Sequence, residues 1–317
     1  MTSSLIWLIT SIITLFLYGV GQGLVKMWIS EVPPARFCLY FVVAKSIVNL
    51  GYFFTHQHPD PFSPEGRTFL LFGIFAYILD GLGWILYFQS IVYGPITIVG
   101  TLSAAYPAIT ILLARIFLSE ILSSVQYMGV ALVIFCCLGL SYSPSNPDDP
   151  NAKVTNRKWI PLAFFALLLW STAQTIMKYA YGLPEASEVN MLLFNTIGGA
   201  LTLGLYGLKN GLKGSHSGKE WIRSFIPMGM MAGGDMGFII AASKGPVSII
   251  SPLTGAYPVV TLAFAAIILK EHISKLQWVC IVVLIFGIFM SAVDKETAKK
   301  IFGNNKNNSA YTYKSLP

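Results

Sequence analysis

The chain has 317 residues, of which 55% are hydrophobic and only 11% are charged, and its net charge is +7 at neutral pH. Together with a mean hydropathy of +0.65, so little charge excludes a soluble globular protein of this size. The basic residues are scattered over short polar segments and the C-terminal stretch. This distribution favours contact with anionic lipid over binding to nucleic acid.

Ten apolar runs follow one another along the chain, separated by short polar segments. Each is long enough for a helix that crosses a membrane. We predict the spans at roughly residues 5–27, 35–54, 68–90, 96–118, 124–142, 160–180, 188–208, 222–243, 247–269 and 275–293.

Polar segments divide the ten spans into two groups of five. The stretch SPSNPDDPNAKVTNRK, rich in Pro, Asn, Asp and Ser, has the composition of a linker. We therefore predict a first five-helix repeat at 1–143, a linker at 144–158, a second five-helix repeat at 159–293 and a polar tail at 294–317.

The two halves contain the same sequence pattern. Residues 94–126 and 245–277 align without a gap and share 14 identities in 33 positions. Trp7, Gln22 and Lys26 match Trp159, Gln174 and Lys178 at one constant offset. Five spans per repeat is an odd number, so the second repeat is expected to enter the membrane from the opposite side, as in many secondary transporters.

Each copy of the pattern holds a proline in the middle of a span, at Tyr106-Pro107 and at Tyr257-Pro258. Proline removes a backbone hydrogen bond and crowds the preceding turn, so both helices are expected to kink there. Such a break is tolerated in a bilayer where other helices or a wet cavity satisfy the freed carbonyl. Both sites are therefore predicted to face the protein interior.

Several of these features resemble a known family. They are LYGVGQGLVK (17–26) echoed by LWSTAQTIMK (169–178), the Gly-Pro turn before spans four and nine, and the L-S-E and L-K-E endings with S-x-x-Q after them. Together with the duplicated plan they resemble the EamA-type transporters of the drug/metabolite transporter superfamily. The resemblance implies a proton-coupled or facilitative carrier of amino acids or nucleotide-like solutes. It also implies cytoplasmic termini and a central cavity formed mainly by spans one, three, four, six, eight and nine.

Two carboxylates lie inside predicted spans, Asp80 in span three and Asp235 in span eight. An ionisable group in a bilayer costs about 2.5 to 3.5 kcal/mol on insertion scales, so each is a functional candidate. Burial disfavours the ionised carboxylate, which is what a proton-coupling group needs. Lys45 in span two is the expected charge partner, with a structural ion pair as the alternative. Structural hydrogen bonding is an equally favoured role for both carboxylates.

The predicted substrate-binding set adds polar and aromatic side chains paired across the repeats. Gln22 and Gln174 are deep in spans one and six, where interhelical hydrogen bonds are the alternative role. The aromatic members have core packing as their alternative. The full set is Gln22, Asp80, Trp84, Tyr106, Trp170, Gln174, Asp235 and Tyr257.

Residues at the predicted span ends have other expected roles. Glu120 and Glu271 are expected to make helix-end or gate contacts, and Lys26 and Lys178 to anchor at the interface. No catalytic constellation, metal-ligand spacing or phosphate-binding loop occurs in the sequence, so we expect no enzymatic activity, metal or cofactor.

The sequence therefore predicts an all-α integral membrane protein of ten transmembrane helices, arranged as two inverted five-helix repeats. Its expected function is secondary transport of a small metabolite by alternating access, with protons as the candidate coupling ion. The expected partners are a small-molecule solute, protons and membrane lipid, with no nucleic acid. A monomer suffices and a dimer is the alternative. We expect a multi-pass protein of the bacterial inner (plasma) membrane. The alternative functions are a membrane-embedded enzyme and a non-transporting membrane scaffold.

Overall fold

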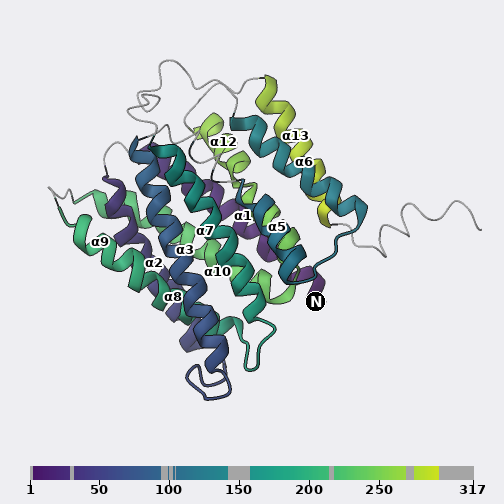
Figure 1. Cartoon of the computed structure of the whole chain (residues 1–317). Helices are drawn as coiled ribbons and strands as arrows, with labels where there is room; N and C mark the ends of the chain where they lie inside the picture. The colour runs from purple at the N-terminus through teal and green to yellow at the C-terminus, as the bar shows by residue number, and fades with distance from the viewer. Residues whose placement is uncertain are drawn as a thin grey trace, which may run out of the picture.

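The computed structural model describes residues 3–28, 32–93, 99, 103, 105–141, 158–213, 218–268 and 275–292. All regular elements in these ranges are helical (Figure 1). The first half contains α1 (Ser3–Trp28), α2 (Pro34–Thr55), α3 (Arg67–Tyr93), α5 (Tyr106–Phe117) and α6 (Ser124–Ser141). Most of 94–104, residues 144–157 of the predicted linker and the tail at 294–317 lie outside the described residues.

The second half contains α7 (Trp159–Ala180), α8 (Glu188–Gly199), the π-helical turn η2 (Ala200–Gly204), α9 (Leu205–Asn210) and α10 (Glu220–Lys244). These are followed by α11 (Val247–Gly255), α12 (Tyr257–Ile268) and α13 (Lys275–Ala292). Over the described residues, seven spans are long and apolar enough to cross a membrane, counting α8 to α9 and α11 to α12 as one each. The chain is thus an α-helical membrane protein that crosses the bilayer several times.

Local sequence explains where several helices begin and break. Pro34 occupies the first turn of α2, where its missing N–H costs no helical hydrogen bond. Ser187 caps α8, because its hydroxyl accepts hydrogen bonds from the amides of Val189 and Asn190. The break predicted in span nine is present: α11 ends at Gly255, Ala256 follows, and α12 starts at Tyr257, with Pro258 next in the chain.

The first copy of this break is described on one side only. α5 begins at Tyr106 and continues through Pro107. The carbonyl of Tyr106 accepts a hydrogen bond of 2.8 Å from the hydroxyl of Ser171 on α7. Tyr106 and Tyr257 are both buried. Both Tyr-Pro sites therefore lie inside the helix assembly, and at the first site a side chain of another helix hydrogen-bonds the backbone.

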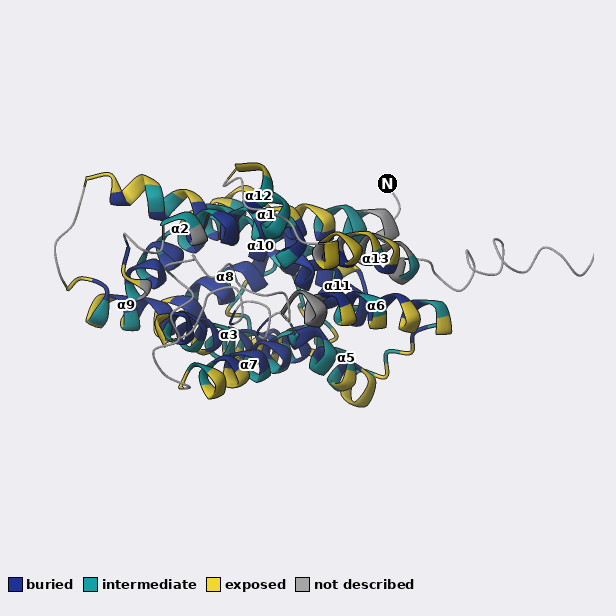
Figure 2. Ribbon diagram, turned by 90° about the horizontal axis from the view of Figure 1, so that it is seen from above, coloured by how far each residue is buried: buried dark blue, intermediate teal, exposed yellow. Residues whose placement is uncertain are grey.

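The long helices form two rows that face each other (Figure 2). In the first row α2 packs on α10, α10 on α1 and α1 on α12. In the second row α8 packs on α3, α3 on α7 and α7 on α5. The pair α6 and α13 packs together at one end of the molecule (Figure 1). Each row thus alternates between helices of the two halves of the chain.

Contacts at successive positions fix the relative directions of neighbouring helices. α1 is antiparallel to α10, and α3 is antiparallel to α7. α2 is parallel to α10, α8 is parallel to α3, and α2 is antiparallel to α8. The direction of α1 and α10 is given by Trp7 with Gly245 and Thr14 with Gly234, and that of α3 and α7 by Gly83 with Trp170 and Tyr77 with Met177. The direction of α2 and α10 is given by Arg36 with Glu220 and Lys45 with Asp235. The direction of α8, continued by η2 and α9, is given relative to α3 by Gly73 with Phe194 and Gly81 with Thr202, and relative to α2 by Lys45 with Gly199 and Leu39 with Gly207.

Candidate substrate and coupling site

A charge centre lies between the two rows. The ammonium of Lys45 on α2 is 3.2 Å from a carboxylate oxygen of Asp80 on α3 and 2.6 Å from one of Asp235 on α10. Lys45 is 1% exposed, whereas the Asp80 side chain is 22% exposed. One buried cation therefore contacts two carboxylates, one from each row, and Asp80 is the more accessible of the two.

Two aromatic residues complete the surroundings of this centre. The hydroxyl of Tyr18 on α1 donates a hydrogen bond to Oδ1 of Asp235. The ring of Phe41 lies beneath Lys45, with 4.5 Å between the ammonium nitrogen and the ring centroid. This is a favourable cation–π distance. Lys45, Asp235 and Tyr18 belong to one row, so among the contacts of this charge centre the Lys45–Asp80 ion pair is the one that crosses to the other row.

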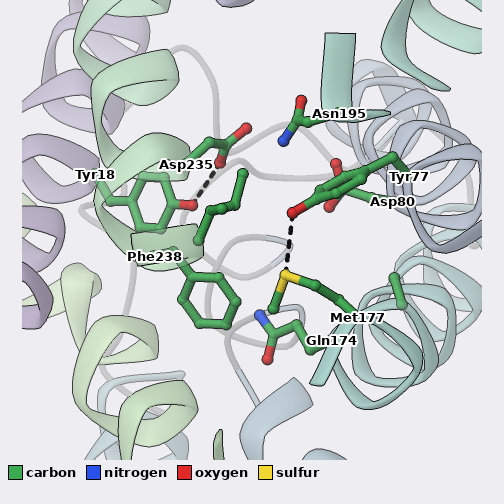
Figure 3. A pocket seen from close by; sticks show the side chains of 10 residues that line it. Tyr18, Tyr77, Asp80, Gln174, Met177, Asn195, Asp235 and Phe238 are labelled. Carbon is green, nitrogen blue, oxygen red and sulfur yellow. Dashed lines mark hydrogen bonds between the residues drawn. The ribbon is translucent and has the colours of Figure 1, made fainter. Parts of the chain in front are cut away.

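A small cavity adjoins the charge centre. Figure 3 shows that its side chains come from both rows and point toward a common space. The lining residues are Tyr18, Tyr77, Asp80, Ala173, Gln174, Met177, Asn195, Asp235, Phe238 and Ile239.

Two amide side chains supply polar groups to the cavity away from Lys45. Oε1 of Gln174 accepts hydrogen bonds from the hydroxyls of Ser251 at 2.7 Å and Thr110 at 3.5 Å. These bonds direct the amide nitrogen of Gln174 into the cavity (Figure 3). Asn195 on α8 is 1% exposed, and its Oδ1 has no hydrogen-bond partner. A buried unpaired amide oxygen is costly, so this atom is a ready acceptor for a bound solute.

Of the predicted substrate-binding residues, the structure brings Asp80, Gln174 and Asp235 to the cavity. Four of the others form aromatic contacts beside it: Trp170 contacts Trp84 at 4.8 Å and Tyr106 at 6.0 Å between ring centroids, and Tyr257 contacts Tyr18 at 6.1 Å. Gln22 is buried, and its Oε1 accepts a hydrogen bond from Tyr87. These five residues do not line the cavity, and their role in binding stays a prediction.

Seven of the ten lining residues were not in the predicted set, and helical spacing points to three of the larger ones. Tyr77 precedes Asp80 by three residues, Met177 follows Gln174 by three, and Phe238 follows Asp235 by three, so each shares a helix face with a predicted site residue. Tyr18 had a different signal. It matches Trp170 in the repeated pattern, so alignment of the two halves places an aromatic residue at this position of both repeats.

A second polar cluster holds the Gly-Pro turn between α10 and α11. The ammonium of Lys178 donates hydrogen bonds of 2.8 and 2.7 Å to the carbonyls of Ala242 and Gly245 at the end of α10. The carboxylate of Glu120 accepts hydrogen bonds from the amides of Val247 and Ser248 at the start of α11, and from the Ser248 hydroxyl.

This cluster places charge where each helix end favours it. A cation lies at the carbonyl end of α10 and an anion at the amide end of α11. Glu120 therefore makes a helix-end contact of the predicted kind. Lys178 also binds a helix end and is partly buried. The matching Gly94, Pro95 and Glu271, and the side chain of Lys26, lie outside the described residues.

One buried ion pair was not expected from the sequence. Arg36 and Glu220 lie 2.7 Å apart and are 2% and 5% exposed. Arg36 also donates hydrogen bonds to the carbonyls of Gly211 and Lys213. These groups fasten α10 to α2 at one end of the first row, so the pair is structural. In the described part of the chain, no three His, Cys, Asp or Glu side chains gather in a metal-binding arrangement.

Comparison with known proteins agrees with the duplicated architecture. A model of the EamA-like transporter family matches residues 5–142 and again 157–293. The chain belongs to the EamA-like transporter family. The two matches together span nearly the whole chain. Transport, and not catalysis, is the activity associated with this family.

Solved structures show the same fold. Among 28 matching chains is one described only as a crystal structure of a protein. It covers 95% of this chain and 99% of its own length with a TM-score of 0.71 and 15% sequence identity. At this identity the likeness shows the fold alone. No curated protein matches the chain.

Proposed function

We propose that this protein is a proton-coupled secondary transporter, and that the cavity beside Lys45, Asp80 and Asp235 is its solute site. The observation that carries the proposal is the position of Lys45, which contacts one carboxylate from each row at the wall of a cavity between the rows. Ionisable groups inside a bilayer are costly and are found mainly on substrate and ion pathways.

Helix directions support an inverted repeat of five helices. α1 is antiparallel to α10, which is parallel to α2; α7 is antiparallel to α3, which is parallel to α8. Because α2 and α8 are antiparallel, α1 and α7 run in opposite directions. The order of helices in the rows supports the same conclusion. Replacing each helix of the row α2–α10–α1–α12 by its counterpart from the other half of the chain gives the other row, α8–α3–α7–α5. With α5, α6 and α13 at spans four, five and ten, the proposal has ten spans.

Alternating access follows from the position of the charge centre. The Lys45–Asp80 contact joins the rows, whereas the Lys45–Asp235 contact lies within one row. Movement of one row against the other must therefore change the surroundings of Asp80. A proton or a solute that alters the charge of Asp80 alters the free energy of the cross-row contact. This is the physical link that we propose between ion binding and rocking about Pro107 and Pro258.

The proposed cargo is a small metabolite, an amino acid or a nucleotide-like solute. The mixture of aromatic walls, two carboxylates and two amides supports a solute with both polar and apolar parts. Residues of both halves of the chain line the cavity, which supports a monomer as the transporting unit. The bacterial inner membrane stays the proposed location. Five predicted binding residues do not line this cavity. We propose that they contact the solute in other conformations of the transport cycle; they are Gln22, Trp84, Tyr106, Trp170 and Tyr257.

Uptake by reconstituted vesicles tests the proposal. Purified protein is placed in liposomes, and accumulation of labelled phenylalanine, adenosine and 2-phenylethylamine is measured with and without an imposed pH gradient. We expect gradient-driven uptake of at least one probe, and loss of more than about 90% of it in Asp80→Asn and Asp235→Asn. Asp60→Asn, which changes an exposed loop carboxylate, is the control. Unchanged uptake in both site variants would remove their coupling role.

A further inference from the structure

The charge balance at the cavity is uneven. Two carboxylates, Asp80 and Asp235, face one ammonium, Lys45. No other charged side chain of the described residues contacts this centre. The remaining titratable neighbours are Tyr18 on α1, bonded to Asp235, and Tyr77, which lines the cavity beside Asp80. Both are neutral phenols. With all three groups ionised the centre carries one uncompensated negative charge in an apolar protein interior, so it requires a positive partner.

A second and independent observation indicates a ligand with hydrogen-bond donors. Asn195 lines the cavity, and its buried Oδ1 has no hydrogen-bond partner. An ammonium bound next to Asp80 can donate to a carboxylate oxygen and to an amide oxygen, because it carries several N–H groups. In Figure 3, Asn195, Tyr77 and Asp80 lie on the same side of the cavity. We therefore place the ammonium of the ligand on this side.

The rest of the cavity lining is mostly apolar. Phe238, Met177 and Ile239 supply apolar surface, and the ring of Tyr18 adds an aromatic face. The amide nitrogen of Gln174 is a polar donor that points into the cavity (Figure 3). A ligand that satisfies all of these groups has a cationic end, an apolar or aromatic body and at most one small acceptor. Because the cavity is small, the ligand is restricted to a single ring or a short chain.

We propose that the cavity binds a small monoammonium solute with an apolar body, and that its ammonium takes the place of one proton shared by Asp80 and Asp235. This inference rests on the proposed transport function and makes it specific. The exchange balances in charge: the empty site holds Lys45, two carboxylates and one proton, and the loaded site holds Lys45, two ionised carboxylates and one ammonium. Solute and proton compete for the same site, so they move in opposite directions.

The same charge balance disfavours anions. A nucleotide phosphate or a carboxylic acid without an amine would face two carboxylates, whose single cation is already paired with both. Like charges in a desolvated site repel strongly. The proposal thus narrows the cargo to amines, including amino acids whose carboxylate reaches the Gln174 amide, and excludes nucleotide-like anions.

Three matched probes test the ligand class in detergent, without transport. They are 2-phenylethylamine, which carries the ammonium, 2-phenylethanol, which is neutral, and 3-phenylpropanoate, which is an anion. We expect saturating 2-phenylethylamine to raise the apparent melting temperature of the wild-type protein by at least about 2 °C, and the other two to leave it unchanged. An equal shift with the alcohol, a shift with the acid, or no shift with any probe would overturn the proposal.

Proton release tests the exchange in the same preparation. Addition of 2-phenylethylamine to wild-type protein in weakly buffered solution near neutral pH should release about one proton per bound ligand, measured with an indicator dye. Asp80→Asn should lose both the release and the thermal shift, and Asp60→Asn should keep both. Binding without release in the wild type would contradict the exchange, even if Asp80→Asn does not fold.

Binding and transport can fail separately. Amine binding with proton release but no gradient-driven uptake would sustain the ligand class and contradict the transport proposal. Uptake of adenosine or of an anion that depends on Asp80, without amine binding, would sustain transport and contradict the ligand class.

Discussion

The two rows of helices have matching scaffolds and different chemistry. Gly83 on α3 packs against Trp170 on α7, and Gly234 on α10 packs against Tyr18 on α1, which are corresponding contacts in the repeated pattern. In this register Asp80 corresponds to Met231, and Asp235 corresponds to Trp84. The two carboxylates are thus one helical turn away from symmetric positions. The repeat explains how the cavity is built, whereas its charge comes from substitutions in single copies.

The largest expected effect comes from removing the cation that joins the rows. Lys45→Met leaves Asp80 and Asp235 without their ammonium, so unfolding should become easier by about 3–5 kcal/mol at neutral pH. Denaturant titration in detergent measures this loss. Lys209→Met on α9, where the side chain is exposed, is the matched control and should stay within about 0.5 kcal/mol. A loss for Lys45→Met no larger than for the control would show that the charge centre is not buried.

A second comparison concerns close packing within each row. Gly198→Ala on α8 would bring a methyl group to 2.8 Å from the backbone carbon of Tyr77 on α3, where little can move. We expect a loss of about 1–3 kcal/mol. Gly229→Ala on α10 meets nothing within 4 Å and should stabilise by about 0.5–1 kcal/mol through helix propensity. Equal effects of the two changes on the melting temperature would contradict the packing described for α3 and α8.

A smaller effect is expected at the Gly-Pro turn. Glu120→Gln keeps the shape of the side chain but removes the negative charge from the first amides of α11. The expected loss of stability is about 1 kcal/mol, as for other helix caps. The exposed Glu65 offers the control Glu65→Gln. A change at Glu120 indistinguishable from this control would mean that the carboxylate does not cap α11.

The smallest effect is expected where an ion pair faces solvent. Lys244 on α10 and Glu188 on α8 lie 2.9 Å apart with side chains 36% and 26% exposed. Lys244→Ala should therefore change stability by about 0–1 kcal/mol, and less at high salt. Thermal denaturation at low and high ionic strength measures both values. A loss comparable to that of Lys45→Met would contradict the difference between exposed and buried pairs.

The sequence predicted which segments are helical better than it predicted which faces meet. Apolar runs located the spans, and Tyr257-Pro258 located the break between α11 and α12, because length and proline act through the backbone of one segment. The inward face of a membrane helix is less evident, since lipid and protein interior are both apolar. Trp84 and Trp170 were accordingly assigned to the site, although they pack against each other beside it.

The polar contacts were predictable in part, where a charged residue lies inside an apolar run. Asp80, Asp235 and Lys45 were recognised because a charge in a bilayer stands out against its neighbours. Arg36 and Glu220 were not, since each lies near a helix end, where an exposed charge is ordinary. The hydrogen bond from Tyr18 to Asp235 joins residues 217 positions apart. Only the folded arrangement of α1 and α10 could reveal it.

The central claim is that Lys45 joins carboxylates of both rows in one charge centre. A double-mutant cycle with Lys45→Met and Asp80→Asn measures this most directly, through the free energies of unfolding of the wild type, the two single variants and the double variant. The account predicts that the double variant is less destabilised than the two single losses together, by about 0.5–3 kcal/mol. Strictly additive losses would contradict it, because they would show that Lys45 and Asp80 do not interact across the rows.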